Sequence, residues 1–391
     1  HPGYDGEYGK IQVLNREEID RRAGQTSLFG AEVAAELTPE KAAWAAVSNG
    51  TQTAAGGSPA AGDRAPQAAP ERAARDEGRY GLNDEQWRAA SAAEPAVAVL
   101  AGPGTGKTRT LVYRIIYLVE RCGVDPKHIT AVTFTNKAAG EMRQRLSAHF
   151  SDKRVVKALH IGTFHALCLE LLTAFSQPVR LLGEEEALAL LRGLLPPGNR
   201  SPRAALERIS KYKNGLSDED GELAQAYQAA LEREGAADFD DLLLRVLSAF
   251  EAGGAAVTRA RKRMQYLLVD EFQDINDLQY RLIQAWGKGE RSLFVIGDAD
   301  QAIYGFRGSD AHCFERLAAD RPGLVTLRLT RNYRSTPDIL SCALPILGHR
   351  APGFLEAQRP QGQPVQLYEA KSAFDEGVYV AKAINALMGG V

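Results

Sequence analysis

The sequence of 391 residues has few cysteines, no long apolar run and almost no net charge. Its four cysteines lie far apart and form no Cys-x-x-Cys pair, which argues against a zinc site or disulfide framework and fits a reducing compartment. No run of about 18 apolar residues and no charged leader followed by an apolar stretch occurs, so neither a membrane span nor a signal peptide is predicted. The formal net charge is −2, so any contact with nucleic acid has to come from local basic clusters.

The length allows two or three domains, and the shares of apolar (45%) and charged (25%) residues are ordinary for a globular protein. The chain begins with His1 rather than Met and stops at Val391, just after a helix-like stretch. We interpret it as part of a longer protein. Residues 1–47 are a mixed segment, and 48–79 consist mainly of small, polar and charged residues that cannot bury a core, which predicts a flexible linker.

From about residue 80, short apolar runs alternate with helix-like stretches, a pattern typical of a parallel β-sheet flanked by helices. We therefore predict an α/β fold. The expected strands are Ala96–Ala101, Ile129–Phe134, Leu159–Gly162, Tyr266–Asp270 and Ser292–Gly297, with helices up to Glu120 and from Lys137. No strand is expected between Glu184 and Arg263, so 184–263 is predicted to be an all-helical insertion in this domain.

A glycine-rich loop follows the first expected strand and opens a helix. It consists of Ala101, Gly102, Pro103, Gly104, Thr105, Gly106, Lys107 and Thr108. Backbone N–H groups in such a loop bind phosphate oxygens together with the helix N-terminus. We expect Lys107 to reach the β and γ phosphates of ATP and Thr108 to bind Mg²⁺.

A pair of carboxylates, Asp270 and Glu271, follows the buried run Tyr266–Val269. In parallel sheets, ligands bind at the carboxyl ends of the strands. Asp270 is therefore predicted to hold Mg²⁺, directly or through water, and Glu271 to activate the attacking water as a general base. The two motifs support one another as halves of a single site.

Four further segments make the prediction more specific. They are Phe272–Asp274 after the carboxylate pair, Gly297–Gly308, Thr133–Ala139 and Asn332–Thr336. In this order, the motifs strongly resemble those of UvrD/Rep/PcrA-type superfamily 1 DNA helicases from about Tyr80 onward. The resemblance implies a P-loop NTPase of the RecA-like type, with the first RecA-like domain over 80–183 and 264–334.

The resemblance also implies roles for single residues around ATP. Gln86 matches the residue that reads the adenine edge, and Tyr333 and Arg109 match the residues on either face of adenine. Arg334 matches the arginine that contacts the γ-phosphate, and Gln301 matches the glutamine that couples this phosphate to the DNA side. Each residue type suits its role, because arginine binds phosphate, an aromatic ring stacks on a base, and glutamine both donates and accepts hydrogen bonds.

Helicases of this type hold single-stranded DNA by backbone contacts and stacking, without reading its sequence. The positions that match strand-contacting residues are Phe134, Thr163, His165, Tyr304 and Phe306, the last where many relatives carry Trp. Core packing is expected instead for Phe164, and a structural role for Phe239.

After Arg334 the sequence resembles the opening of a second RecA-like domain, over 335–391. A helix-like segment at 336–348, a strand at Pro364–Glu369 and a helix at Phe374–Met388 are expected. The later motifs of the family are absent, including an arginine that completes the ATP site. Since a motor needs two lobes that close on ATP, we expect these 391 residues to bind nucleotide weakly and not to unwind DNA.

Two short matches lie near the N-terminus. Gln25, Leu28 and Phe29 resemble a peptide that binds sliding clamps, and such a tether would raise the local concentration of the motor at DNA. The alternative for these residues is a short ordered turn. Residues 1–10 faintly resemble the tail of PHP-type phosphoesterases related to EndoQ.

Three functions stay open at this point. The first is an ATP-dependent 3′–5′ DNA helicase of repair or replication, with the polarity implied by the resemblance. The second is the helicase half of a nuclease–helicase fusion, and the third is a non-motor ATP-binding protein that tethers DNA. Intact site residues argue against the third. ATP and Mg²⁺ are the expected cofactors, DNA the expected partner, and the cytoplasm the expected compartment.

Overall fold

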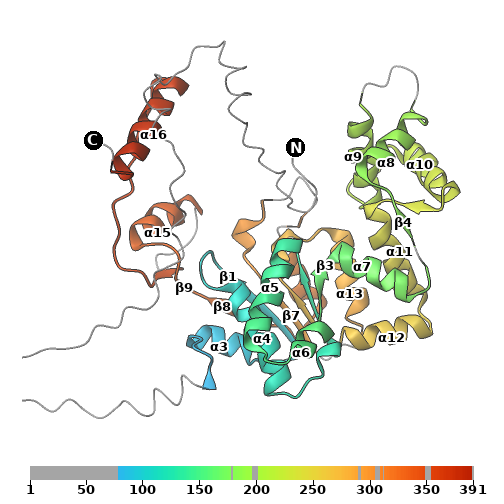
Figure 1. Ribbon diagram of the computed structural model, residues 1–391, viewed down its shortest axis with the longest axis horizontal. Helices are drawn as coiled ribbons and strands as arrows, with labels where there is room; N and C mark the ends of the chain where they lie inside the picture. The colour runs from blue at the N-terminus through green and yellow to red at the C-terminus, as the bar shows by residue number, and fades with distance from the viewer. Residues whose placement is uncertain are drawn as a thin grey trace, which may run out of the picture. The chain divides into compact units, whose positions relative to one another are not determined.

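The computed structural model describes residues 78–177, 179–195, 201–288, 292–303, 309–310, 312–347 and 354–389 (Figure 1). The mixed segment 1–47 and nearly all of the predicted linker lie outside the described residues, as do Gln25, Leu28, Phe29, Tyr304 and Phe306.

A six-stranded parallel sheet organises the fold, in the order β3-β2-β6-β7-β1-β8 (Figure 1). Its strands are β1 (Ala96–Ala101), β2 (Ile129–Thr133), β3 (His160–Thr163), β6 (Tyr266–Val269), β7 (Ser292–Gly297) and β8 (Val325–Leu329). The predicted α/β class is confirmed, and each expected strand of the sheet lies within one residue of its predicted bounds. Because all strands are parallel, their carboxyl ends meet at one edge, where loops can assemble a site.

Apolar side chains of the strands alternate between two cores, one on each face of the sheet. Val97 and Val99 of β1 belong to one core, and Ala98 belongs to the other. The helices of the first core are α3 (Asp84–Ala90), α4 (Lys107–Glu120), α5 (Asn136–His149) and α6 (Lys153–Ala158). The helices of the second are α7 (Phe164–Ala174), α11 (Phe239–Ala252), α12 (Ala255–Arg263), α13 (Asp277–Trp286) and α14 (Cys313–Asp320).

The stretch predicted as a helical insertion, 184–263, includes α11 and α12, which pack in the second core of the sheet. The three helices before them have a core of their own, and the name helical insertion is kept for these three. They are α8 (Glu184–Arg192), α9 (Pro202–Lys213) and α10 (Gly221–Arg233), packed around residues such as Leu191 and Tyr227. The prediction of no strand here is wrong at Ala236–Ala237 (β5), which pairs in parallel with Arg180–Leu181 (β4). Two residues are too few for a periodic pattern, and their partner lies more than 50 residues away.

Two helical segments near the C-terminus agree with their predictions: α15 (Pro337–Ala343) with the 3₁₀ turn Leu344–Leu347, and α16 (Ala373–Leu387). A two-residue pairing joins β9 (Arg331–Asn332) to β10 (Glu356–Ala357). The predicted strand at Pro364–Glu369 is wrong, because this segment has no regular secondary structure. Leu367 in its middle is 98% exposed, and a strand requires a neighbouring strand to satisfy its backbone groups.

Candidate nucleotide-binding site

The glycine-rich loop turns tightly from β1 into α4. Gly104 (φ +70°) and Gly106 (φ +89°) both adopt the left-handed conformation that favours glycine. A Cβ on Gly104 would lie 2.6 Å from Cβ of Arg334, and one on Gly106 would lie 2.6 Å from Nε2 of Gln86. The hydroxyl of Thr105 donates to the Gly102 carbonyl (2.7 Å) and closes the turn.

Lys107 begins α4, so its backbone N–H belongs to the first turn, where helical N–H groups have no partner within the helix. Such N–H groups, together with the positive end of the helix dipole, favour an anion at this point. Thr108 lies in the same turn and is half-buried. The strand, glycine loop and helix are thus arranged to receive phosphate groups.

Asp270 follows β6 directly and is 4% exposed. Its backbone N–H donates to the Val132 carbonyl at the end of β2 (2.9 Å). Burial, and to a lesser extent the charge of Glu271, raises the pKa of Asp270 to about 7, while Lys107 acts in the opposite direction. A cation beside this carboxyl group would restore its charged form, which makes Asp270 a suitable ligand for Mg²⁺.

Glu271 adopts a left-handed conformation (φ 47°), which is uncommon for a residue with a side chain and is concentrated at functional sites. Its Oε2 lies 3.7 Å from Nζ of Lys107 and accepts a hydrogen bond from Nε2 of Gln273 (2.9 Å). The structure therefore brings together the lysine of the glycine loop and the predicted general base.

The residues around Asp270 fit a magnesium ion that is shared with phosphate. Within the described residues, no group of three or more His, Cys, Asp and Glu side chains is placed to hold a metal ion by itself. Mg²⁺ is commonly bound by one or two carboxylates plus substrate phosphates. Asp274, the last residue of the 3₁₀ turn Phe272–Asp274, adds a buried Oδ1 with no hydrogen-bond partner among the described atoms. Burial and the charge of Glu271 raise the pKa of Asp274 to about 6.

A chain of hydrogen bonds leads from Glu271 to Gln301. Gln273 donates to Glu271, and its Oε1 accepts from the Asp298 backbone N–H (2.9 Å). Nε2 of Gln301 in turn donates to Oδ2 of Asp298 (2.8 Å). These hydrogen bonds require glycine at position 297, because a Cβ there would lie 2.3 Å from Oε1 of Gln273. The sequence motifs around Gln273 and Asp298 predicted no role for either residue.

Gln86 and Tyr333, which the resemblance assigns to adenine, both contact the glycine loop. Gln86 is 3% exposed and donates to the Thr105 carbonyl (2.9 Å). The Tyr333 backbone N–H donates to the Gly104 carbonyl (2.9 Å), and its hydroxyl accepts from Nδ2 of Asn83 (2.7 Å). Tyr333 is 46% exposed, so its side chain is accessible to a ligand.

Arg109 and Arg334 are both exposed. The guanidinium of Arg109 donates to the Gly81 carbonyl (3.0 Å), so stacking of Arg109 on adenine stays a prediction. Arg334 is placed by Asn332, which is fully buried. Nδ2 of Asn332 donates to the Pro103 carbonyl (2.6 Å), and its Oδ1 accepts from the Arg334 backbone N–H (2.9 Å). Asn332 thus fixes Arg334 against the glycine loop, a role that its position in a motif did not reveal.

Three predicted strand-contacting residues lie among the described residues. Phe134 follows β2 and is half-buried. Thr163 is 5% exposed and caps α7, its hydroxyl accepting from the Ala166 N–H (3.3 Å). His165 is half-buried and packs edge-on against Phe239. Phe164 is buried against Trp286, as expected for core packing. The contacts with DNA stay predictions.

The sheet, glycine loop and helix define a P-loop α/β protein. The sequence model of the UvrD/REP helicase N-terminal domain matches residues 82–187 and 198–322. The chain belongs to the UvrD/REP helicase family, and the resemblance seen in the motifs is confirmed. Among the described residues, no helix has the length and apolar character to cross a membrane.

Curated relatives extend the match. The chain is 33% identical over 335 residues to the ATP-dependent DNA helicase PcrA of Leuconostoc citreum, covering 78% of this chain and 45% of that protein. It is 36% identical over 331 residues to DNA helicase II of Escherichia coli (strain K12), covering 78% of this chain and 46% of that protein. The chain therefore spans about half the length of the relatives that it matches.

Proposed function

We propose that this chain supplies the ATP-binding part of an ATP-dependent DNA helicase, which moves 3′–5′ along single-stranded DNA in repair or replication. The observation that carries the proposal is the contact between Lys107 and Glu271 at the carboxyl edge of the sheet. Sequence relatives named as ATP-dependent DNA helicases support the same function.

The contact between Lys107 and Glu271 bears on how Glu271 acts as a base. Lys107 lies 3.7 Å from the Glu271 carboxylate and offsets its charge. The triphosphate attracts Lys107, because it carries more negative charge than one carboxylate. Glu271 then loses its ion-pair partner, keeps the hydrogen bond from Gln273, and is free to accept a proton from the attacking water.

Gln301 is proposed to report the state of the phosphate to the DNA side. Its amide is joined through Asp298 and Gln273 to Glu271, so a change at the γ-phosphate moves a connected set of polar groups. The segment that follows Gln301 contains Tyr304 and Phe306, the aromatic residues proposed to stack on bases.

Asp270 and Thr108 are the proposed Mg²⁺ ligands, and Arg334 the proposed γ-phosphate contact. When bound, Mg²⁺ would neutralise charge on the β and γ phosphates. We also propose that the 391 residues by themselves bind nucleotide without unwinding DNA; unwinding of a tailed duplex by the purified chain would contradict this. The cytoplasm is the proposed compartment.

DNA-stimulated ATPase activity tests the main proposal. Glu271→Gln keeps an oxygen for the Gln273 hydrogen bond but removes the base, so turnover should fall by about a hundredfold or more while nucleotide still binds. Glu185→Gln, an exposed change of the same chemistry on α8, serves as the control. Equal turnover of the two variants would show that Glu271 is not the base. No stimulation of the full-length protein by single-stranded DNA would argue against a motor.

A sliding clamp is the proposed protein partner, through Gln25, Leu28 and Phe29. Pull-down with clamp protein should recover the unaltered chain and lose a Leu28→Ala/Phe29→Ala variant. Equal recovery of both would refute the contact.

A further inference from the structure

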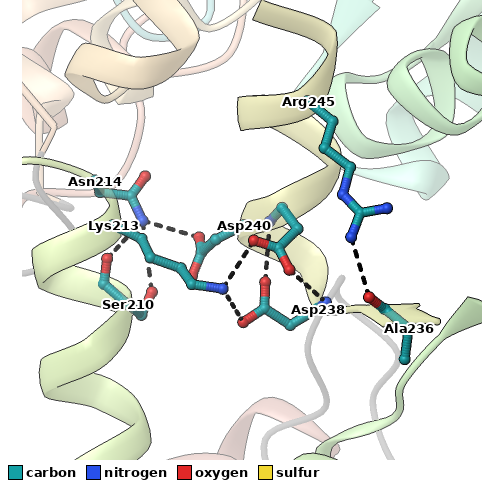
Figure 2. Close-up of polar contacts among 8 residues, drawn as sticks. Ser210, Lys213, Asn214, Ala236, Asp238, Asp240 and Arg245 are labelled. Atoms are coloured by element: carbon teal, nitrogen blue, oxygen red, sulfur yellow. Dashed lines mark hydrogen bonds and ion pairs between the residues drawn. The ribbon is translucent and has the colours of Figure 1, made fainter. Parts of the chain in front are cut away.

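A buried polar network joins the helical insertion to the start of α11 (Figure 2). Asn214, the residue after α9, is 8% exposed. Its Nδ2 donates to the Ser210 carbonyl (2.8 Å) and to Oδ1 of Asp240 (2.8 Å). Both N–H bonds are thereby used, and the amide cannot be turned over, because its oxygen would then face two acceptors. Oδ1 of Asn214 is therefore left to accept a hydrogen bond from another group.

The donor is Asn276, which begins α13. Nδ2 of Asn276 lies 3.2 Å from Oδ1 of Asn214, and its own Oδ1 accepts from the Gln279 backbone N–H (2.9 Å) as the helix cap. The cap fixes the orientation of this second amide as well. In the contact between the two asparagines, Asn276 is therefore always the donor and Asn214 always the acceptor.

Asn276 lies where three parts of the chain meet. The 3₁₀ turn Phe272–Asp274 separates it from Glu271 by only a few residues. Its backbone bridges to Ser309, and the Asp310 N–H donates to the Ile275 carbonyl (3.3 Å). Residue 309 directly follows the segment with Tyr304 and Phe306. Asn276 thus contacts the insertion through its side chain, follows Glu271 closely in the chain, and pairs with Ser309 through its backbone.

The insertion side of this contact is stiff. Nζ of Lys213 lies 2.8 Å from both Oδ2 of Asp238 and Oδ1 of Asp241, and the Lys213 side chain is 6% exposed (Figure 2). Asp238 and Asp241 also cap α11 reciprocally. These buried charges and hydrogen bonds hold α9, and Asn214 at its end, in a fixed position against α11.

We infer that the Asn214–Asn276 hydrogen bond transmits the position of the helical insertion to the loop that carries Glu271, so that Asn276 is a positioning residue for hydrolysis. The inference rests on the proposed function, since it assumes that Glu271 acts in ATP turnover. DNA that displaces the insertion would move Asn276, and with it the turn Phe272–Asp274.

Asn276→Asp is the sharpest test. Aspartate caps a helix as well as asparagine does, so α13 keeps its start. The substitution replaces the N–H that faces Asn214 by an oxygen, which removes the contact. Asn385→Asp makes the same change at an exposed position on α16 and is the matched control.

Two measurements separate the outcomes. Hydrogen–deuterium exchange at Phe272–Ile275 should be faster in Asn276→Asp than in Asn385→Asp, at an equal melting temperature. The ratio of DNA-stimulated to basal ATPase rates should fall by roughly threefold to tenfold, with an unchanged KM for ATP. Unchanged exchange, or an unchanged ratio, would overturn the inference. The ATPase rates are measured on the full-length protein; if it shows no stimulation by DNA, the proposed function fails instead, and the exchange measurement alone decides whether the contact holds the loop.

Discussion

Replacing Lys213 by methionine should strongly destabilise the helical insertion. Lys213 contacts two carboxylates, and the side chains of Lys213, Asp238 and Asp241 are 6%, 12% and 4% exposed. Methionine has similar bulk but no charge, so both carboxylates would stay buried without their cation. Breaking a buried ion pair from one side costs about 3–5 kcal/mol. We expect a loss of this size at about pH 7.5.

The pH dependence has a definite sign. Burial raises the pKa of Asp238 above its ordinary value, and Lys213 opposes that shift. Without Lys213 the pKa in the folded state rises further, so the folded state binds a proton that the unfolded state has released. Its stability therefore falls as the pH rises from the ordinary pKa of 3.8 through the folded one. The difference between variant and unaltered chain should be smaller at about pH 5 than at about pH 7.5.

Urea unfolding, followed by hydrogen–deuterium exchange of the backbone amides of α9 and α11, measures the loss of stability at these two helices. Arg203→Met is the control, since Arg203 pairs with Glu184 on the surface, where their side chains are 59% and 40% exposed. Such pairs contribute about 0–1 kcal/mol. A Lys213→Met variant that is no less stable than Arg203→Met at about pH 7.5 would refute the reasoning.

Two further predictions concern the nucleotide site. Gly104→Ala should weaken nucleotide binding by roughly tenfold or more in a fluorescence titration, because Gly104 is left-handed and its Cβ would collide with Arg334; Gly123→Ala, also left-handed but with open space around it, is the control, and equal affinities would contradict this account. Asp270→Asn should stabilise the nucleotide-free chain by about 4 kcal/mol at about pH 8, because burial raises the pKa of Asp270 to about 7 and its charged form is disfavoured. The gain in stability should shrink as the pH falls below 7, because Asp270 then takes up its proton in the folded state. Thermal melts of both proteins at two pH values measure this gain, and a gain that does not change with pH would refute the reasoning.

Much of the fold and part of the site follow from local sequence. The strand β1, the glycine loop and the start of α4 are adjacent in the chain, and the loop's glycines carry their backbone requirement in their own residue type. Asp270 and Glu271 follow a short apolar run that is typical of a buried strand, and the structure has a strand there. Parallel strands then bring their carboxyl ends to one edge, so these residues were predictable as one site.

Only the tertiary structure decided which side chains support that site. Gln273, Asp298 and Gln301 form a hydrogen-bonded chain because β6 and β7 are neighbours in the sheet. Asn332 fixes Arg334 to the glycine loop across more than 200 residues of sequence.

The same limit explains the two errors. The pairing of Ala236–Ala237 with Arg180–Leu181 was missed, and the strand at Pro364–Glu369 was wrongly expected. Residue type and spacing determine what a segment can form, whereas a hydrogen bond or a strand pair exists only if a partner, often distant in sequence, is brought beside it.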